Sequence, residues 1–209
     1  MNLPNKITMT RIFMIPVFIA VFYCGLLTPW CFLASAVVFL VAALTDALDG
    51  HIARSRHLIT DLGKFLDPIA DKVLVSSAFI IMLTVPDAFN VYPFENCGLI
   101  VAGVLVAFVL ARELIVSGFR IIAAGKKVVL AADKLGKIKT VSQDIAIALL
   151  LVAMSLLQYG LAGEIVAYAG LVVFVFSSLM TIISGVNYLV KNKAVLKDDN
   201  SAKDEGEHS

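Results

Sequence analysis

Four aspartates recur at helical spacing inside a chain of 209 residues that is otherwise mostly apolar. They lie in the stretch DALDGHIARSRHLITDLGKFLDPIADK, where Asp46 and Asp49 are three positions apart and Asp67 and Asp71 are four positions apart. Residues three or four apart share one face of an α-helix, so two helices joined by a short loop can turn all four carboxylates toward a common space. Carboxylate oxygens are the ligands that hard divalent cations such as Mg²⁺ take, and the pattern therefore predicts a divalent-metal site.

These residues also have plainer interpretations. A single aspartate near a helix end is commonly a cap or a surface group, but four on converging faces would repel one another without a cation. Small residues such as Gly50, Ala53 and Gly63 let membrane helices pack closely whatever their function. For Gly50 and Ala53, the closeness to the first aspartate pair favours making room for a ligand. Three small residues on the last apolar run are predicted to serve packing alone: Ser177, Thr181 and Gly185.

The composition identifies the environment in which these aspartates must work. Hydrophobic residues make up 60% of the chain and charged residues only 16%, and the mean hydropathy is +0.93. This balance is typical of a membrane protein rather than a soluble domain. The net charge is only +1, and no nucleic-acid-binding motif is present, so nucleic acid is not an expected partner.

Six apolar runs approach the length of about 20 residues that a bilayer span requires. The predicted spans are residues 12–27, 30–48, 65–85, 99–123, 138–158 and 165–190. The connections that contain no Lys or Arg are residues 28–29, 86–97 and 160–164. All 17 basic residues fall on the other connections or at the helix ends facing them, which places both termini and the aspartates in the cytoplasm. We therefore expect an all-α polytopic membrane protein with six transmembrane helices.

The two ends of the chain differ from the spans. The segment NLPNKITMTRIF is predicted to form a short interfacial helix on the membrane surface before the first span. No small-residue cleavage site follows the first apolar run, so we expect it to be retained. Residues 1–190 form the expected membrane domain, and the polar residues 191–209 form an expected disordered cytoplasmic tail. The three cysteines, Cys24, Cys31 and Cys97, lack metal-ligand spacing and are predicted to be buried, inert thiols.

The full spacing of the acidic stretch resembles the signature of the CDP-alcohol phosphatidyltransferase family. Written out, it is Asp46-x2-Asp49-Gly50-x2-Ala53-Arg54-x8-Gly63-x3-Asp67-x3-Asp71, and all eight defining positions match. The segments NLPNKITMTRIFMIP and ARELIVSGFRIIAAGKKVVLAADKLGKIKTVSQD are similar to the bacterial branch of that family that makes phosphatidylglycerophosphate. The resemblance thus extends over most of the chain.

The resemblance implies a fold, a reaction and roles for the matched residues. Members are six-helix membrane enzymes, usually homodimers, that transfer a phosphatidyl group from CDP-diacylglycerol to an alcohol and release CMP. By this likeness Asp46, Asp49 and Asp67 ligate Mg²⁺ or Mn²⁺, and Asp71 lies near the metal as the general base. The residues implied to bind CDP-diacylglycerol are Gly50, Ala53, Arg54 and Gly63. Two residues before the first span, Thr8 and Arg11, are placed close enough to help hold its pyrophosphate.

Basic residues on the middle cytoplasmic face indicate the acceptor. An acceptor with its own phosphate needs several cations, whereas serine, choline or ethanolamine does not. We predict a glycerol 3-phosphate site formed by Arg112, Arg120, Lys137 and Lys139, with His57 as a further candidate. Topological charge bias explains the other basic residues of this face, Lys126, Lys127 and Lys134, equally well, and His57 is also compatible with a solvated loop. Arg112 lies within an apolar run, where it is expected to pair with Glu113 or with a substrate anion.

Three other functions are compatible with clustered aspartates. The same reaction class could use another acceptor, such as inositol phosphate. A membrane prenyltransferase also binds a diphosphate through paired aspartates and Mg²⁺, but it does not require Gly50, Ala53 and Arg54. A cation transporter would place acidic residues near the bilayer midplane between broken helices, whereas these aspartates lie toward helix ends beside basic loops. The expected location is the bacterial cytoplasmic membrane.

Overall fold

The computed structural model describes the backbone of residues 3–56, 61–91, 97–125 and 134–192, and the side chains of residues 9–45, 72–87, 89–91, 97–123 and 136–192. All regular elements in this part of the chain are helical, as predicted. The α-helices are α1 (Leu3–Cys24), α2 (Trp30–Arg56), α3 (Asp61–Met82), α4 (Gly98–Gly125), α5 (Lys134–Leu156) and α6 (Leu161–Lys191). Two 3₁₀ turns, η1 (Pro86–Ala88) and η2 (Leu157–Tyr159), precede α4 and α6.

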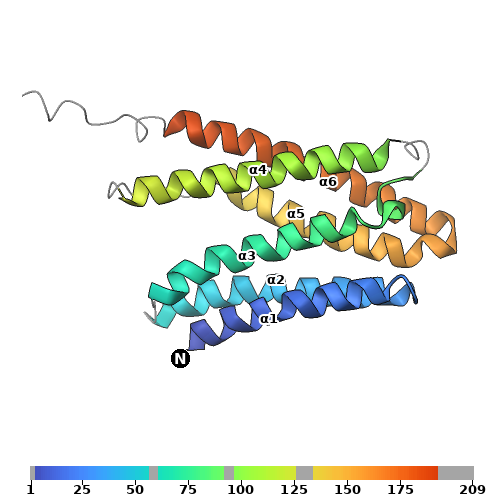
Figure 1. Cartoon of the computed structure of the whole chain (residues 1–209), viewed down its shortest axis with the longest axis horizontal. Helices are drawn as coiled ribbons and strands as arrows, with labels where there is room; N and C mark the ends of the chain where they lie inside the picture. The colour runs from blue at the N-terminus through green and yellow to red at the C-terminus, as the bar shows by residue number, and fades with distance from the viewer. Residues whose placement is uncertain (1–2, 57–60, 92–96, 126–133, 193–209) are drawn as a thin grey trace, which may run out of the picture.

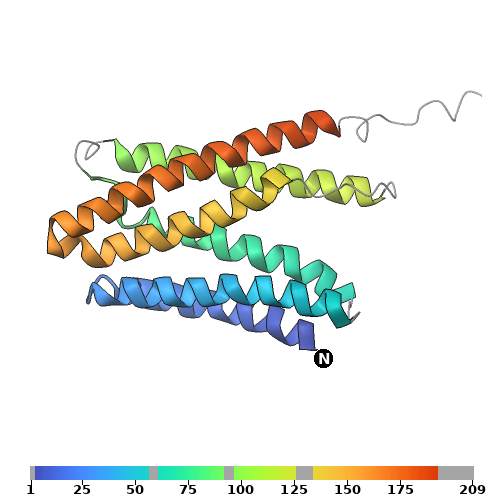
Figure 2. The same cartoon turned by 180° about the vertical axis from the view of Figure 1, so that it is seen from behind.

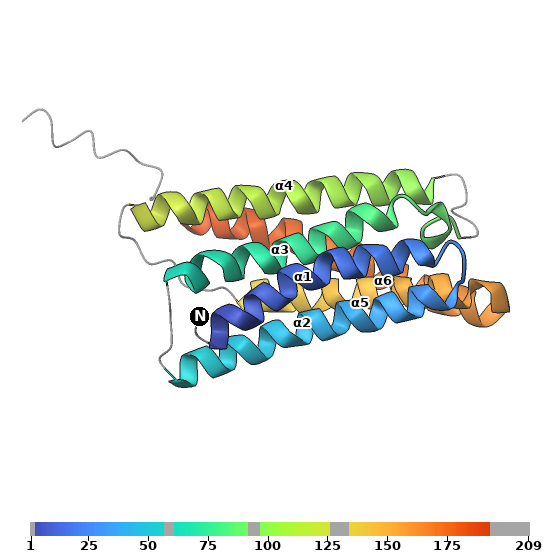
Figure 3. The ribbon, with the colours of Figure 1, turned by 60° about the horizontal axis from the view of Figure 1, so that its bottom comes forward.

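The six helices run back and forth along one elongated bundle (Figure 1). Helix α5 packs along α6, α1 packs along α2, and further contacts join α2 to α5, α1 to α3 and α4 to α6. Figure 2 shows the α5–α6 hairpin in yellow and orange from behind. Because successive helices alternate in direction, the start of α1, the end of α2 and the start of α3 lie at one end (Figure 3). The ends of α4 and α6 lie toward that same end.

Aromatic side chains form much of the buried core. Phe79 of α3 and Phe89, which follows η1, each pack against Phe174 of α6, with ring centroids 5.4 and 5.7 Å apart. Phe18 of α1 packs against Phe39 of α2 at 5.8 Å. Such tilted pairs add to the stability that comes from burying apolar area. These side chains belong to one buried cluster with residues from all six described α-helices.

Large apolar side chains also cover the outside of the bundle. Exposed examples are Leu27, Ile100, Leu114, Ile121 and Val172. Among the described side chains, three helical segments are long and apolar enough to cross a membrane: Gly98–Ala123, Gly136–Tyr159 and Leu161–Lys191. The described parts of α1, α2 and α3 add shorter apolar segments: Met9–Cys24, Trp30–Thr45 and Lys72–Met82. An apolar exterior of this extent is what lipid requires, and the chain has the character of a membrane protein.

Helix α2 continues past the predicted span, which ends at residue 48, to Arg56, as the helical spacing of Asp46 and Asp49 predicted, because hydropathy marks where lipid ends rather than where the helix ends. The described structure differs from the prediction at two places. Helix α1 is continuous from Leu3, so no separate interfacial helix precedes the first span. Cys24 and Cys97 are exposed and Cys31 is only partly buried, so the prediction of buried thiols was wrong. These cysteines lie at or beside helix termini, where few neighbouring side chains cover them.

Candidate functional site

Helices α2 and α3 carry the acidic stretch. Asp46 and Asp49 lie in the last part of α2, and Asp67 and Asp71 lie in the first part of α3. Both segments are helical throughout, so the two members of each pair occupy neighbouring turns, as the spacing predicted. The predicted residues whose side chains lie outside the described part are Thr8, Asp46, Asp49, Gly50, Ala53, Arg54, His57, Gly63, Asp67 and Asp71.

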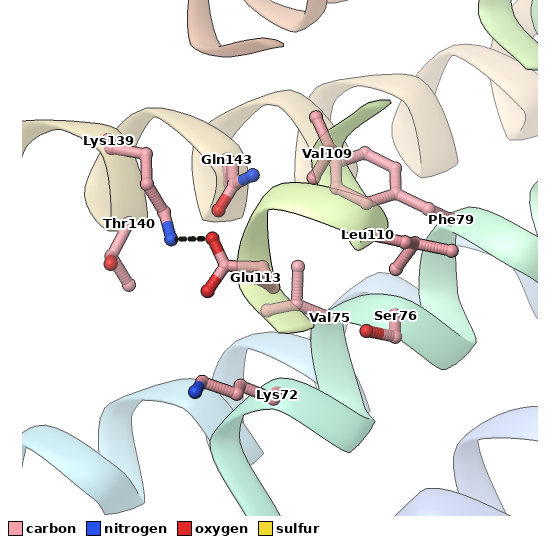
Figure 4. Close-up of a pocket in the computed structure, with 10 residues that line it drawn as sticks. All are labelled: Lys72, Val75, Ser76, Phe79, Val109, Leu110, Glu113, Lys139, Thr140 and Gln143. Atoms are coloured by element: carbon pink, nitrogen blue, oxygen red, sulfur yellow. Dashed lines mark hydrogen bonds and ion pairs between the residues drawn. The ribbon is translucent and has the colours of Figure 1, made fainter. Parts of the chain in front are cut away.

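A small polar cavity lies where α3, α4 and α5 meet. Lys72 of α3, Glu113 of α4 and Lys139 of α5 line it, together with Gln143. Figure 4 shows Lys139 and Glu113 facing each other, with Lys72 on the α3 side of the cavity. The volume is about 20 Å³, enough for about one water molecule. Apolar side chains close the deeper side of this cavity: Val75, Phe79, Val109 and Leu110.

Glu113 organises the basic side chains around the cavity. Its Oε1 accepts a hydrogen bond from Arg112 Nη1 at 2.9 Å and another from Lys139 Nζ. Lys72 Nζ donates to Ser117 Oγ, which in turn donates to the Glu113 carbonyl oxygen. Side-chain exposure is 15% for Arg112, 16% for Glu113 and 9% for Lys139. Charges removed from water to this extent need close partners, and three helices supply them here.

The predicted acceptor-binding residues do not all join this cluster. Arg112 and Lys139 share Glu113, whereas the Lys137 side chain is exposed on α5. Arg120 lies farther along α4, where its Nε donates to Tyr188 Oη at 3.2 Å and its guanidinium stacks over the Tyr188 ring at 5.3 Å. The structure therefore brings two of the four predicted cations together and places the other two elsewhere.

Helix α6 also contributes to the cluster. Arg112 Nη2 donates to Ser184 Oγ at 2.7 Å. Gln143 of α5 donates to Thr181 Oγ1 at 3.2 Å, in the buried seam between α5 and α6. Helix α1 carries another deeply buried guanidinium, that of Arg11, which is only 1% exposed. Arg11 was predicted to act on the donor side, and α1 packs against both helices that carry the aspartates.

The prediction from sequence missed Lys72, Gln143 and Ser184. Lys72 follows Asp71 directly and lies within the predicted span of residues 65–85, and a charged residue inside such a span was an available signal. Nothing in the local sequence distinguishes Gln143 or Ser184 from ordinary polar residues of a span. Their roles depend on which helices pack together, and spacing within one helix does not contain that information.

Basic side chains from three helices gather near Glu113, beside the helix that carries Asp67 and Asp71. Lys72, Arg112 and Lys139 supply donors from three helices, and Lys72 is the neighbour of Asp71 in α3. Among the described side chains no group of three or more His, Cys, Asp or Glu could hold a metal ion. The candidate metal ligands are therefore the aspartates of α2 and α3, whose side chains lie outside that part.

Comparisons with known proteins cover nearly the whole chain. The family model described as CDP-alcohol phosphatidyltransferase matches residues 1–186. A Bacillus subtilis (strain 168) protein named CDP-diacylglycerol–glycerol-3-phosphate 3-phosphatidyltransferase is 40% identical over 211 residues, which cover 95% of this chain and 99% of the relative. Proteins with the same name are 37% identical in Rickettsia bellii, covering 90% of this chain and 93% of the relative, and 35% identical in Escherichia coli K12, covering 94% and 98%.

Proposed function

The chain belongs to the CDP-alcohol phosphatidyltransferase family, and from this premise we propose that it transfers the phosphatidyl group of CDP-diacylglycerol to glycerol 3-phosphate. The products are phosphatidylglycerophosphate and CMP, so the reaction belongs to phospholipid biosynthesis. The observation that carries the proposal is the match to relatives named for this reaction over nearly their whole length. The basic cluster around Glu113 supports it, because the acceptor carries a phosphate.

The aspartates of α2 and α3 suit a hard divalent cation. Each pair lies on a continuous helix with its members in neighbouring turns, and carboxylates are the ligand type that Mg²⁺ and Mn²⁺ favour. The family is generally dependent on a divalent metal. We assign the ligand role to Asp46, Asp49 and Asp67, with Asp71 beside them. When bound, the cation stabilises negative charge on the pyrophosphate oxygens of the donor.

The remaining residues bind the donor and move the proton. Asp71 accepts the proton of the acceptor hydroxyl. The hydroxyl oxygen then attacks the phosphorus that carries diacylglycerol, the bond to the CMP phosphate oxygen breaks, and CMP leaves. The residues assigned to CDP-diacylglycerol are Gly50, Ala53, Arg54 and Gly63, with Thr8 and Arg11 of α1 at the pyrophosphate.

The acceptor phosphate is assigned to the basic cluster and its surroundings. Arg112 presents a planar guanidinium fork that matches phosphate oxygens, and Lys139 adds a compact positive charge. Both share Glu113, and Lys139 lines the cavity together with Lys72, the residue after Asp71 in α3. The outer candidates are Arg120, Lys137 and His57. The exposure of the Arg120 and Lys137 side chains fits contacts at the entrance better than contacts in the cavity, and His57 lies outside the described residues.

We further propose that all six helices cross the membrane and that both termini and the aspartates face the cytoplasm of a bacterial cell. The connections at the far end of the bundle contain no Lys or Arg. In this orientation the acyl chains of the donor stay in lipid while its headgroup reaches α2 and α3. A homodimer completes the proposed assembly, with residues 1–190 as one membrane domain and residues 191–209 as its cytoplasmic tail.

An acceptor assay tests the proposed reaction. Purified protein in detergent with CDP-diacylglycerol and Mg²⁺ should release CMP when glycerol 3-phosphate is added, and should release little with serine or inositol 1-phosphate. In the same assay Asp71→Asn should lose transfer while still binding CDP-diacylglycerol. Asp87→Asn, an exposed aspartate in η1 at the other end of the bundle, should keep full activity. CMP release with serine but not with glycerol 3-phosphate would refute the assigned acceptor, and full activity of Asp71→Asn would remove the base.

A further inference from the structure

Gly185 of α6 lies directly against the side chain of Arg112. A Cβ atom added to this glycine would lie 2.5 Å from Arg112 Cγ and 2.8 Å from Nε. Ordinary van der Waals contact begins at 3.4 Å, so the arginine stem would have to move by about 1 Å to admit even an alanine. The atoms concerned are the middle of the side chain rather than its flexible tip. The absence of a side chain at residue 185 therefore sets the path that Arg112 follows.

Two hydrogen bonds then hold the far end of the same arginine. Ser184, the residue before the glycine, accepts from Nη2 at 2.7 Å, and Glu113 accepts from Nη1 at 2.9 Å. The guanidinium is thus held from α4 on one side and from α6 on the other. A free arginine side chain has many rotamers, and fixing one of them costs conformational entropy. Here the side chain is already fixed in the folded protein, so this entropy is not lost when a ligand binds.

Gly185 was predicted from sequence to be a plain packing residue. In a typical small-residue contact, the small side chain lets two helix backbones approach or accepts an apolar neighbour. Gly170 of the same helix is of that kind, since its nearest neighbour is the Leu150 side chain of α5 at 3.0 Å. At Gly185 all three nearest neighbours belong to one arginine. The glycine therefore makes room for a charged side chain within the candidate site.

We propose that Gly185 and Ser184 are positioning residues that hold Arg112 in the geometry needed to bind the acceptor phosphate. The inference rests on the proposed function, because Arg112 is there assigned to that phosphate. It adds that α6, which carries none of the signature residues, helps to determine affinity for the acceptor. Gly185 and Ser184 act only through Arg112 and contact neither the donor nor the reacting atoms.

Steady-state kinetics of Gly185→Ala test this role. Because misplacing a binding group by about 1 Å has large effects on a reaction, we expect the KM for glycerol 3-phosphate to rise about tenfold or more. The KM for CDP-diacylglycerol should stay within about twofold of the wild-type value, since the proposed function assigns Arg112 to the acceptor and not to the donor. The matched control is Gly103→Ala on α4, where an added Cβ would meet nothing within 4 Å and both KM values should be unchanged.

A double-mutant cycle separates positioning from general damage. If Gly185 acts through Arg112, then Gly185→Ala should add no further loss in an Arg112→Ala background. An unchanged KM for glycerol 3-phosphate, an equal rise in both KM values, or a full additional loss in that background would each overturn the proposal. Wild-type transfer to glycerol 3-phosphate is measured in the same series, so a failure of the proposed reaction would be recognised separately.

A second variant keeps the test decisive if Gly185→Ala does not fold. Ser184→Ala removes one hydroxyl and creates no clash. A hydrogen bond to a charged group is worth enough that its loss should raise the KM for glycerol 3-phosphate about fivefold to tenfold. The melting temperature of the detergent-solubilised protein should change little. An unchanged KM in this variant would also overturn the proposal.

Discussion

At the scale of single residues, burial distinguishes cations that look equivalent in sequence. Lys137 and Lys139 are separated only by Ile138 and were predicted to serve the same phosphate. In the structure Lys139 is 7% exposed and bonded to Glu113, whereas Lys137 points away from the cluster and is exposed. A charge held in a partly desolvated site interacts more strongly with an incoming anion than one surrounded by water. We therefore expect the two lysines to contribute unequally.

Replacing each lysine by methionine tests this difference. Lys139→Met should raise the KM for glycerol 3-phosphate about tenfold or more, because it removes a buried charged donor. Lys137→Met should change the same KM by less than about threefold, because water screens an exposed charge. The measurement is CMP release at varied glycerol 3-phosphate concentration. Equal effects of the two substitutions would show that burial does not rank these cations.

The sequence was sufficient to predict which types of residue form this site, but not which side chains each of them contacts. The pairing of Arg112 with Glu113 was one of two expected outcomes, and the structure contains it, because an arginine in an apolar run needs a near counter-charge. The role of Gly185 was not predictable. This role depends on the packing of α4 against α6, which brings Gly185 into contact with Arg112 although the two residues are far apart in the sequence.

At the scale of elements, the α5–α6 hairpin depends on a close approach between backbones. Helix α6 begins at Leu161, directly after η2, and Gly160 between them has a φ of 67°, in the left-handed region that favours glycine. Gly163 follows in the first turn of α6. A Cβ at that position would lie 2.3 Å from the Leu156 carbonyl oxygen. Backbone atoms cannot rotate away as a side chain can, so the hairpin leaves no room for a larger residue.

Gly163→Ala should therefore destabilise the protein. Overpacking against rigid neighbours typically costs about 2 kcal/mol, which lowers the melting temperature of a chain of this size by about 5 °C. Thermal unfolding of the detergent-solubilised protein measures the shift. Gly103→Ala, with open space around the added Cβ, should leave the melting temperature unchanged or slightly higher. Equal melting temperatures for the two variants would contradict the close approach at Gly163.

Apolar periodicity was a good guide to where helices lie and a poor guide to where they end. Long apolar runs indicated all six α-helices of the described chain. The apolar runs stop short where a helix continues into polar residues, as α2 does to Arg56 and α1 does from Leu3. At the end of α2 the spacing of the aspartates, rather than hydropathy, predicted the continued helix. Polar residues maintain helical hydrogen bonds as well as apolar ones do, so a change in hydropathy marks a change of solvent. That continuation is important here, because it carries Asp49 and Arg54 on the same helix as Asp46.

At the scale of the whole molecule, successive helices alternate in direction, so the candidate catalytic aspartates lie at one end of the bundle and the cysteines at the other. The end of α2 and the start of α3 carry the aspartates (Figure 3). Cys24 ends α1, Cys31 is the second residue of α2 and Cys97 immediately precedes α4, all at the opposite end of the bundle. Charge follows the same division, since the connections at the cysteine end contain no Lys or Arg. The proposed orientation therefore predicts which native thiols face the outside of the cell.

Labelling with a membrane-impermeant maleimide tests that orientation. In a Cys24→Ala, Cys31→Ala background, the remaining Cys97 is exposed and should react in intact cells. A second variant that also carries Cys97→Ala and has Lys191→Cys at the exposed end of α6 should react only after the membrane is made permeable. The contrast is expected because the two sites lie at opposite ends of one helical bundle, and the proposed orientation places its basic end in the cytoplasm. The reverse pattern would place the aspartates outside the cell, where the proposed substrates are not supplied. Labelling of both sites in intact cells would mean that not all six helices cross the membrane.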